Sequence, residues 1–114
     1  MTVFFKNKKL AKSAADLEVL DKNFGQSGRW IGKCIAVLKA VPNLAELFRP
    51  AHKRYRCHLL RNDKYGKYSL DERDPYRVLF KPVDPVPYKP GTKEIDAEKV
   101  DTVVVTDLHI NTHE

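Results

Sequence analysis

The chain has 114 residues, of which 42% are apolar and 32% are charged. This length suits one compact domain, and the composition is that of a globular chain rather than a disordered or collagen-like one. We therefore expect a single domain over residues 1–114, which excludes a multidomain enzyme. The 21 Lys and Arg outnumber the 15 Asp and Glu, and the net charge of +6 favours a polyanionic partner, above all nucleic acid.

The sequence contains no apolar run approaching the roughly 20 residues that a membrane-spanning helix needs. The first nine residues, MTVFFKNKK, place positive charge after a short apolar stretch and contain no cleavage site, so they do not look like a secretory signal. The two cysteines, Cys34 and Cys57, are too few for a disulfide framework. We expect a cytoplasmic protein with reduced thiols and no membrane partner.

The first third of the chain has helical spacing. After a short β-prone stretch at residues 3–5, apolar residues recur at intervals of three and four, which predicts one amphipathic helix over residues 8–23, ended by Gly25. Ser27 is a plausible N-cap for a second helix, which Pro42 stops. The two helices are expected to form a hairpin.

From residue 55 onward the residue types favour strands separated by polar turns. Four prolines and a glycine between positions 82 and 91 remove too many backbone donors for a ladder, so residues 82–95 are expected to form a proline-rich loop. Helical turns are expected at residues 96–99 and at residues 44–48, where Asn43 and Glu46 resemble a capping box. The expected strands cover residues 56–60, 67–70, 76–80 and 103–105.

These elements predict an α+β fold, with an N-terminal helical hairpin packed on one face of a small, mainly antiparallel, twisted sheet. A sheet covered by helices on one side can leave its second face open to a ligand. Functional side chains are therefore expected on that second face.

Positive charge is concentrated between positions 49 and 67, where seven of the 21 basic residues lie and Asp63 is the only acid. The period of a strand would place Arg56 and His58 on one face, where both could meet the same phosphate. A solvated surface with no ligand is an equally common role for such a cluster. Interleaved tyrosines could stack on unpaired bases or simply pack half-buried, and here they are Tyr55, Tyr65 and Tyr68.

The histidines allow acid–base chemistry, because imidazole titrates near about pH 6.5 and needs no metal. In RNA cleavage a base takes the proton of the ribose 2′-hydroxyl, an acid protonates the leaving 5′-oxygen, and a guanidinium offsets charge on the phosphate. Arg77 is the candidate guanidinium, and its structural alternative is an ion pair with Glu72 or Asp74. His109 and His113 lack the further closely spaced ligands of a zinc site, so no metal is expected.

Two runs of residues resemble the HigB-like toxins of the RelE/ParE superfamily. They are HLLRNDKYGKYSL at residues 58–70 and PYRVLF at residues 75–80. In those toxins a strand with His and Leu leads to a Gly-containing turn, a Ser-bearing strand and a Tyr-Arg-aliphatic-Phe strand. The likeness extends from residues 5–10 to His113 and leaves out only the proline-rich loop.

The resemblance implies a RelE/ParE-like toxin of a bacterial type II toxin–antitoxin system, a ribosome-dependent endoribonuclease that cleaves messenger RNA without metal or cofactor. Its implied partners are a helix-turn-helix antitoxin, the ribosome with its messenger RNA, and operator DNA only through the antitoxin complex. By position, His58, Arg77 and His113 correspond to catalytic residues of the family. The residues implied to hold the RNA backbone are Arg54, Arg56, Arg61, Lys64 and Lys67.

The chain departs from the family at its C-terminal Asp-Tyr-His pattern, where it has Asn111, Thr112 and His113. Asn111 can accept a hydrogen bond from an imidazole N–H, but it cannot stabilise a protonated ring by charge. Two alternatives to the nuclease stay open, and the missing Asp and Tyr favour the second of them. One is a ParE-type inhibitor of DNA gyrase that cleaves nothing, and the other is a catalytically impaired homologue that only binds its antitoxin.

Overall fold

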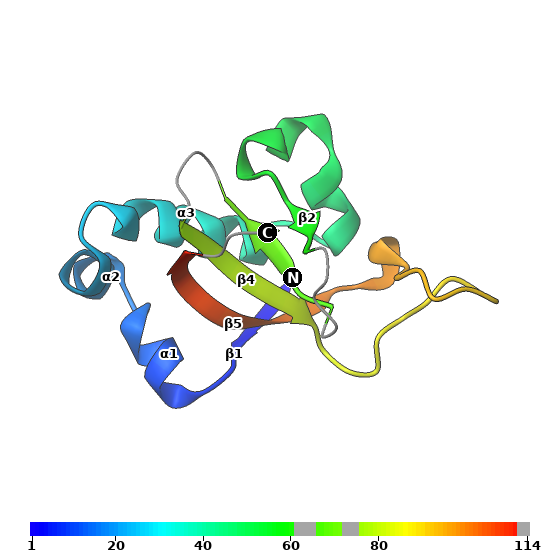
Figure 1. The fold of residues 1–114 in the computed structure, drawn as a ribbon, viewed down its shortest axis with the longest axis horizontal. Helices are drawn as coiled ribbons and strands as arrows, with labels where there is room; N and C mark the ends of the chain where they lie inside the picture. The colour runs from blue at the N-terminus through cyan, green and yellow to red at the C-terminus, as the bar shows by residue number, and fades with distance from the viewer. Residues whose placement is uncertain (61–65, 72–75, 112–114) are drawn as a thin grey trace.

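The computed structural model describes residues 1–60, 66–71 and 76–111. Within these ranges three α-helices and three short 3-10 helices accompany a five-stranded sheet, so the fold is α+β, as expected (Figure 1). None of the helices in these ranges is long and apolar enough to cross a membrane.

The sheet has the strand order β1-β5-β4-β3-β2. At one edge β1 (Thr2–Phe5) runs parallel to β5 (Thr102–Asn111), and β5 runs antiparallel to β4 (Tyr76–Pro82). On the other side of β4, β3 (Tyr68–Leu70) and the short edge strand β2 (His58–Leu59) follow, each antiparallel to its neighbour. The sheet is thus mixed, with the parallel pair confined to the β1 edge.

The segment expected to form the first helix contains two. Three residues separate the end of α1 (Lys8–Ser13) from the start of α2 (Leu17–Phe24). Asp16 causes the restart, because its carboxylate accepts a backbone N–H of the first turn of α2 at 2.9 Å and so caps a new helix. The prediction of one continuous helix over residues 8–23 is wrong, since the apolar spacing persists across a break that the cap creates.

The next helix, α3 (Ser27–Ala40), lies where the sequence predicts it and passes behind the sheet in Figure 1. It packs closely on α2 at Gly28, where an added Cβ would lie 2.7 Å from the carbonyl oxygen of Leu20. This close packing is between α2 and α3. Side chains of α3 such as Cys34 and Leu38 are fully buried and form one wall of the core.

Two of the 3-10 helices confirm the expected helical turns. η1 (Leu44–Phe48) begins after Asn43, whose side chain accepts the backbone N–H of Glu46 at 3.2 Å. η3 (Ala97–Lys99) lies within the turn expected at residues 96–99. The buried side chains of η1, Leu44 and Leu47, belong to the core.

The strand expected over residues 56–60 is shortened to β2 by the third 3-10 helix, η2 (Pro50–Tyr55). η2 ends at Arg56, which adopts the left-handed conformation with φ 48° and ψ 45°. A residue in that conformation cannot belong to an extended strand, so the ladder begins only at His58.

The proline-rich loop takes part in pairing at two places. Pro82 is the last residue of β4 and is paired with Val103, and an isolated bridge joins Tyr88 to Ile95. The prediction that residues 82–91 take part in no ladder is wrong at Pro82 and Tyr88, because a proline at a strand end still offers its carbonyl and Tyr88 keeps its N–H.

Candidate functional site

Two residues that the sequence singled out, His58 and Arg77, lie on one face of the sheet. His58 of β2 is paired with Ser69 of β3, and Ser69 is paired with Leu79 of β4. Paired residues project from the same face, as do residues two apart on a strand, so Arg77 shares this face with them. The neighbours Val78 and Phe80 point the other way, into the core.

We call this surface the polar face, because charged and hydroxyl side chains gather on it in several strands. Its cationic groups come from β4, from the turn after η2 and from the residue before β3, and its carboxylates follow β3 and lie on β5. The polar face consists of Arg56, His58, Lys67, Ser69, Asp71, Arg77, Thr106 and Asp107.

At the end of β3, Asp71 links two guanidinium groups. One carboxylate oxygen lies 3.2 Å from Nη1 of Arg56, and the other lies 3.4 Å from Nε of Arg77. These are ion-pair distances, longer than those of a short charge-assisted hydrogen bond. Asp71 is only 3% exposed, and a buried carboxylate is tolerated when cations compensate its charge. Arg77 was expected to bind phosphate or to pair with Glu72 or Asp74, and the pairing that the structure describes is with Asp71.

The ring of His58 is oriented by the backbone of the preceding turn. Its Nδ1 lies 2.6 Å from the carbonyl oxygen of Arg56. A carbonyl oxygen only accepts hydrogen bonds, so Nδ1 must carry a proton in this contact. In the neutral ring the lone pair is then on Nε2, which is the atom able to accept a proton.

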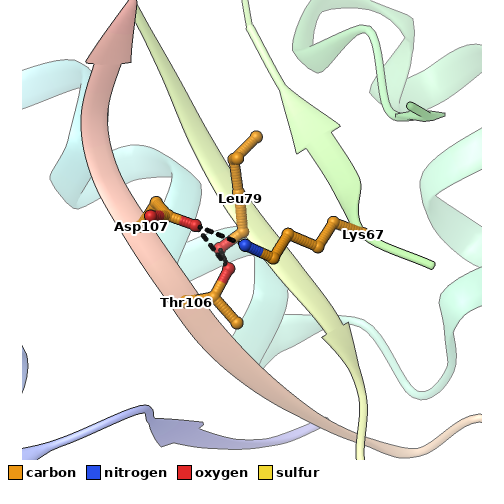
Figure 2. Close-up of polar contacts among 4 residues, drawn as sticks. All are labelled: Lys67, Leu79, Thr106 and Asp107. Atoms are coloured by element: carbon orange, nitrogen blue, oxygen red, sulfur yellow. Dashed lines mark hydrogen bonds and ion pairs between the residues drawn. The ribbon is translucent and has the colours of Figure 1, made fainter. Parts of the chain in front are cut away.

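A second charged cluster of the polar face joins β3 to β5, and Figure 2 shows its contacts. Nζ of Lys67 lies 3.2 Å from Oδ2 of Asp107, and Thr106 donates its hydroxyl proton to the same oxygen at 2.8 Å. A register shift between β4 and β5 sets Asp107 opposite Leu79. Lys67, which was expected to hold RNA backbone, thus has a carboxylate partner on the same face.

Two tyrosines of the basic cluster are packing residues. Tyr55 stacks on Trp30 with ring centres 5.2 Å apart, and the guanidinium of Arg54 lies 5.7 Å from the Tyr55 ring. Tyr68 is buried and stacks on Phe80 at 5.7 Å. Tyr55 is half-buried and Tyr68 is buried, and each ring stacks on another aromatic ring of the protein, so both agree with the packing alternative.

Several residues named from the sequence lie outside the part of the chain that the structure describes. They include the proposed C-terminal acid–base residue and two of the residues expected to hold RNA. These residues are Arg61, Lys64, Tyr65, Glu72, Asp74, Thr112 and His113.

The cysteines offer no nucleophile at neutral pH. Cys34 is fully buried in the core, as its helical position predicts. Burial raises the pKa of the Cys57 thiol to about 12, so it remains protonated and unreactive near pH 7. In residues 1–60, 66–71 and 76–111 no group of three His, Cys, Asp or Glu side chains lies close enough to hold a metal ion.

A groove of about 820 Å³ lies at the β2 edge, and Leu59, which alternates with His58, faces it. Phe48, Leu59 and Tyr88 are each about half exposed along its walls. Its charged lining has more acids than bases, which makes it a poor surface for a polyanion. Those residues are Lys89, Lys93, Glu94, Asp96 and Glu98.

On the polar face, in contrast to the groove, cations outnumber carboxylates. In the described part of the chain it combines three permanent cations, Arg56, Lys67 and Arg77, with two carboxylates, Asp71 and Asp107. His58 adds a titratable group beside them. This face suits a polyanion better than the groove does, because its cations outnumber its carboxylates.

In comparisons with known proteins, no family model, no curated protein and no solved structure matches this chain. Its function is therefore inferred from the chemistry of the polar face and from the resemblance of residues 58–80.

Proposed function

We propose that this protein is the toxin of a bacterial type II toxin–antitoxin system, with a RelE/ParE-like fold and HigB-like activity. It acts in the cytoplasm as a ribosome-dependent endoribonuclease that cleaves messenger RNA by acid–base chemistry without a metal. The observation that supports this most directly is the placement of His58 and Arg77 on the same sheet face. An imidazole and a guanidinium that face one phosphodiester are the groups this reaction needs.

In the proposed reaction Nε2 of His58 takes the proton of the ribose 2′-hydroxyl. The 2′-oxygen attacks phosphorus, the bond to the 5′-oxygen breaks, and the products are a 2′,3′-cyclic phosphate and a 5′-hydroxyl. His113 donates the proton to the leaving oxygen, and Arg77 stabilises the negative charge that grows on the phosphate. Nε2 of His58 suits the role of base, because Nδ1 carries the proton that contacts the Arg56 carbonyl and the lone pair of the neutral ring is on Nε2.

The partners follow from the same proposal. Basic residues along the chain hold the RNA backbone by charge, which makes binding weaker as salt rises. A helix-turn-helix antitoxin neutralises the toxin, and the complex binds operator DNA through the antitoxin. The proposed RNA-binding residues are Arg54, Arg56, Arg61, Lys64 and Lys67.

The test is primer extension on a translated message after brief induction of the full chain in a bacterial host. The wild-type protein is expected to create new 5′ ends at codon boundaries. Replacing His58 and His113 together by alanine should reduce cleavage by about 100-fold or more, the size of a lost acid–base contribution. Undiminished growth arrest and cleavage in that double variant would overturn the proposal.

His52→Gln is a matched control, because His52 lies in η2 and its Nδ1 bonds the carbonyl of Glu46, not the polar face. It should cleave like the wild type. Asn111 in place of the family's Asp favours one rival, a catalytically impaired homologue, which would create no new message ends. Double-strand DNA breaks with intact message would instead indicate a gyrase inhibitor.

A further inference from the structure

We infer that Asp71 is a positioning residue for this reaction. It holds Arg77 on the polar face and, through Arg56, fixes the proton of the His58 ring on Nδ1. This role rests on the proposed nuclease function and deepens it. Asp71 does not touch the substrate, but it positions His58 and Arg77, which do.

Asp71 contacts both Arg77 and Arg56, the residue whose carbonyl oxygen contacts the His58 ring. Its two carboxylate oxygens lie 3.2 Å from the Arg56 guanidinium and 3.4 Å from that of Arg77. Its backbone N–H also donates to the carbonyl oxygen of Tyr55 at 3.0 Å. The side chain and the main chain of one buried residue thus both hold the turn at residues 55–56.

That turn decides the orientation of the imidazole. Arg56 adopts the left-handed conformation, which costs an ordinary residue about 1 to 2 kcal/mol and therefore needs support from its surroundings. In this conformation its carbonyl oxygen lies 2.6 Å from Nδ1 of His58. The ion pair with Asp71 and the hydrogen bond to Tyr55 supply the support, so loss of the carboxylate should loosen the contact with the ring.

The contact with the Arg56 carbonyl selects one tautomer of the neutral His58 ring. While the Arg56 carbonyl accepts from Nδ1, the neutral ring has its lone pair on Nε2. A ring that lost this contact would divide its proton between the two nitrogens, and part of the population would present no base at Nε2. Without the Asp71 carboxylate, Arg77 would also lose the ion pair that ties it to the end of β3.

The polar face contains its own control for this inference. Lys67 and Asp107 form a second carboxylate–cation pair on the same face, and the contacts of Asp107 are with Lys67 and Thr106 rather than with Arg56 or Arg77. Asp107→Asn therefore removes a carboxylate of the same surface without breaking the Asp71 ion pairs.

The first test is the tautomer of His58 in the whole protein, read from ¹⁵N chemical shifts of the imidazole at a pH where the ring is neutral. The wild type is expected to show one tautomer, with the proton on Nδ1. Asp71→Asn should give a mixture of both tautomers, whereas Asp107→Asn should give the wild-type spectrum. An unmixed Nδ1–H ring in Asp71→Asn would overturn the inference.

Arg56→Ala keeps the test decisive if Asp71→Asn fails to fold. The Arg56 side chain is 62% exposed, so its removal should leave the core intact. Alanine cannot form the ion pair that supports the left-handed conformation at this position, so Arg56→Ala should mix the tautomers as well. A single Nδ1–H tautomer in Arg56→Ala would overturn the inference independently.

The second test is single-turnover cleavage of message on the ribosome. Asp71→Asn should slow the chemical step by about 100-fold, while binding of the message is unchanged or tighter because one negative charge is lost. Equal losses in binding and in the chemical step would indicate a merely structural role and overturn the inference.

The two proposals fail separately. If the wild type cleaves no message and the tautomer still mixes in Asp71→Asn, the nuclease function is wrong and the control of His58 by Asp71 stands. If the wild type cleaves and Asp71→Asn keeps both the tautomer and the rate, the nuclease stands and the role of Asp71 is wrong.

Discussion

Two buried hydroxyl groups on the polar face should respond to removal in opposite directions. The side chain of Ser69 is fully buried, and its Oγ has no hydrogen-bond partner among the residues that the structure describes. Thr106 is also buried, but its hydroxyl donates to Oδ2 of Asp107 at 2.8 Å. The two positions therefore compare an unsatisfied hydroxyl on β3 with a satisfied one on β5, in the same sheet.

The expected magnitudes follow from the cost of an unmade hydrogen bond. A buried hydroxyl without a partner costs about 1 to 3 kcal/mol, so Ser69→Ala removes that penalty. The space left by one oxygen atom returns only a few tenths of a kcal/mol as a cavity cost. Ser69→Ala should therefore stabilise the protein by about 1 to 2 kcal/mol. Thr106→Val keeps the shape and loses a hydrogen bond to a carboxylate, which should destabilise by about 1 to 2 kcal/mol.

Urea unfolding of the purified protein measures both changes. Equal slopes of the unfolding free energy against urea in all three proteins would show that only stability has changed. The melting temperature should rise for Ser69→Ala and fall for Thr106→Val, each by several degrees, on the order of 5 °C per kcal/mol for a domain of this size. A loss of stability in Ser69→Ala as large as that in Thr106→Val would refute the reasoning, because it would mean that the Ser69 hydroxyl has a partner.

Two further predictions concern the packing of α2 on α3 and the half-buried thiol of Cys57. Gly28→Ala should destabilise by about 2 kcal/mol, because its Cβ would lie 2.7 Å from a backbone oxygen of α2, whereas Gly32→Ala meets only side chains at 3.3 Å and should be neutral or stabilising in urea unfolding. Burial raises the pKa of Cys57 from 9.0 to about 12, so the unfolded chain loses this proton at lower pH than the folded one. Stability should thus be full below pH 9 and fall as pH rises toward 12, by about 2 kcal/mol between pH 9 and pH 11. Cys57→Ser lacks this titration, and an equal alkaline loss in that variant would contradict the assignment.

Elements whose residues interact with near neighbours could be predicted from the sequence. The turn at η1 follows from Asn43 and Glu46, which meet within one helical turn, and α3 follows from its own apolar period. The prediction failed where two local patterns competed. At Asp16 the apolar spacing of a helix continues across the residue, so the spacing does not reveal that Asp16 caps a new helix. At positions 56–60 the residue types favour a strand, and they do not reveal the left-handed conformation of Arg56.

His58 and Arg77 could be singled out by residue type, but Asp71 could not. A single aspartate after a strand has no period or spacing that distinguishes it from a turn residue. Asp71 meets Arg56 and Arg77 because β2, β3 and β4 pair in one register, with His58 opposite Ser69 and Ser69 opposite Leu79.

The sequence by itself determined the α+β class, the net positive charge and the chemical groups available for a reaction. These properties depend on each residue and its neighbours a few positions away. Only the tertiary structure decided which groups share a face and which carboxylate pairs with which cation. Those contacts depend on strand register, which the packing of the whole apolar core selects, since a slip of one residue would turn every side chain of a strand to the opposite face.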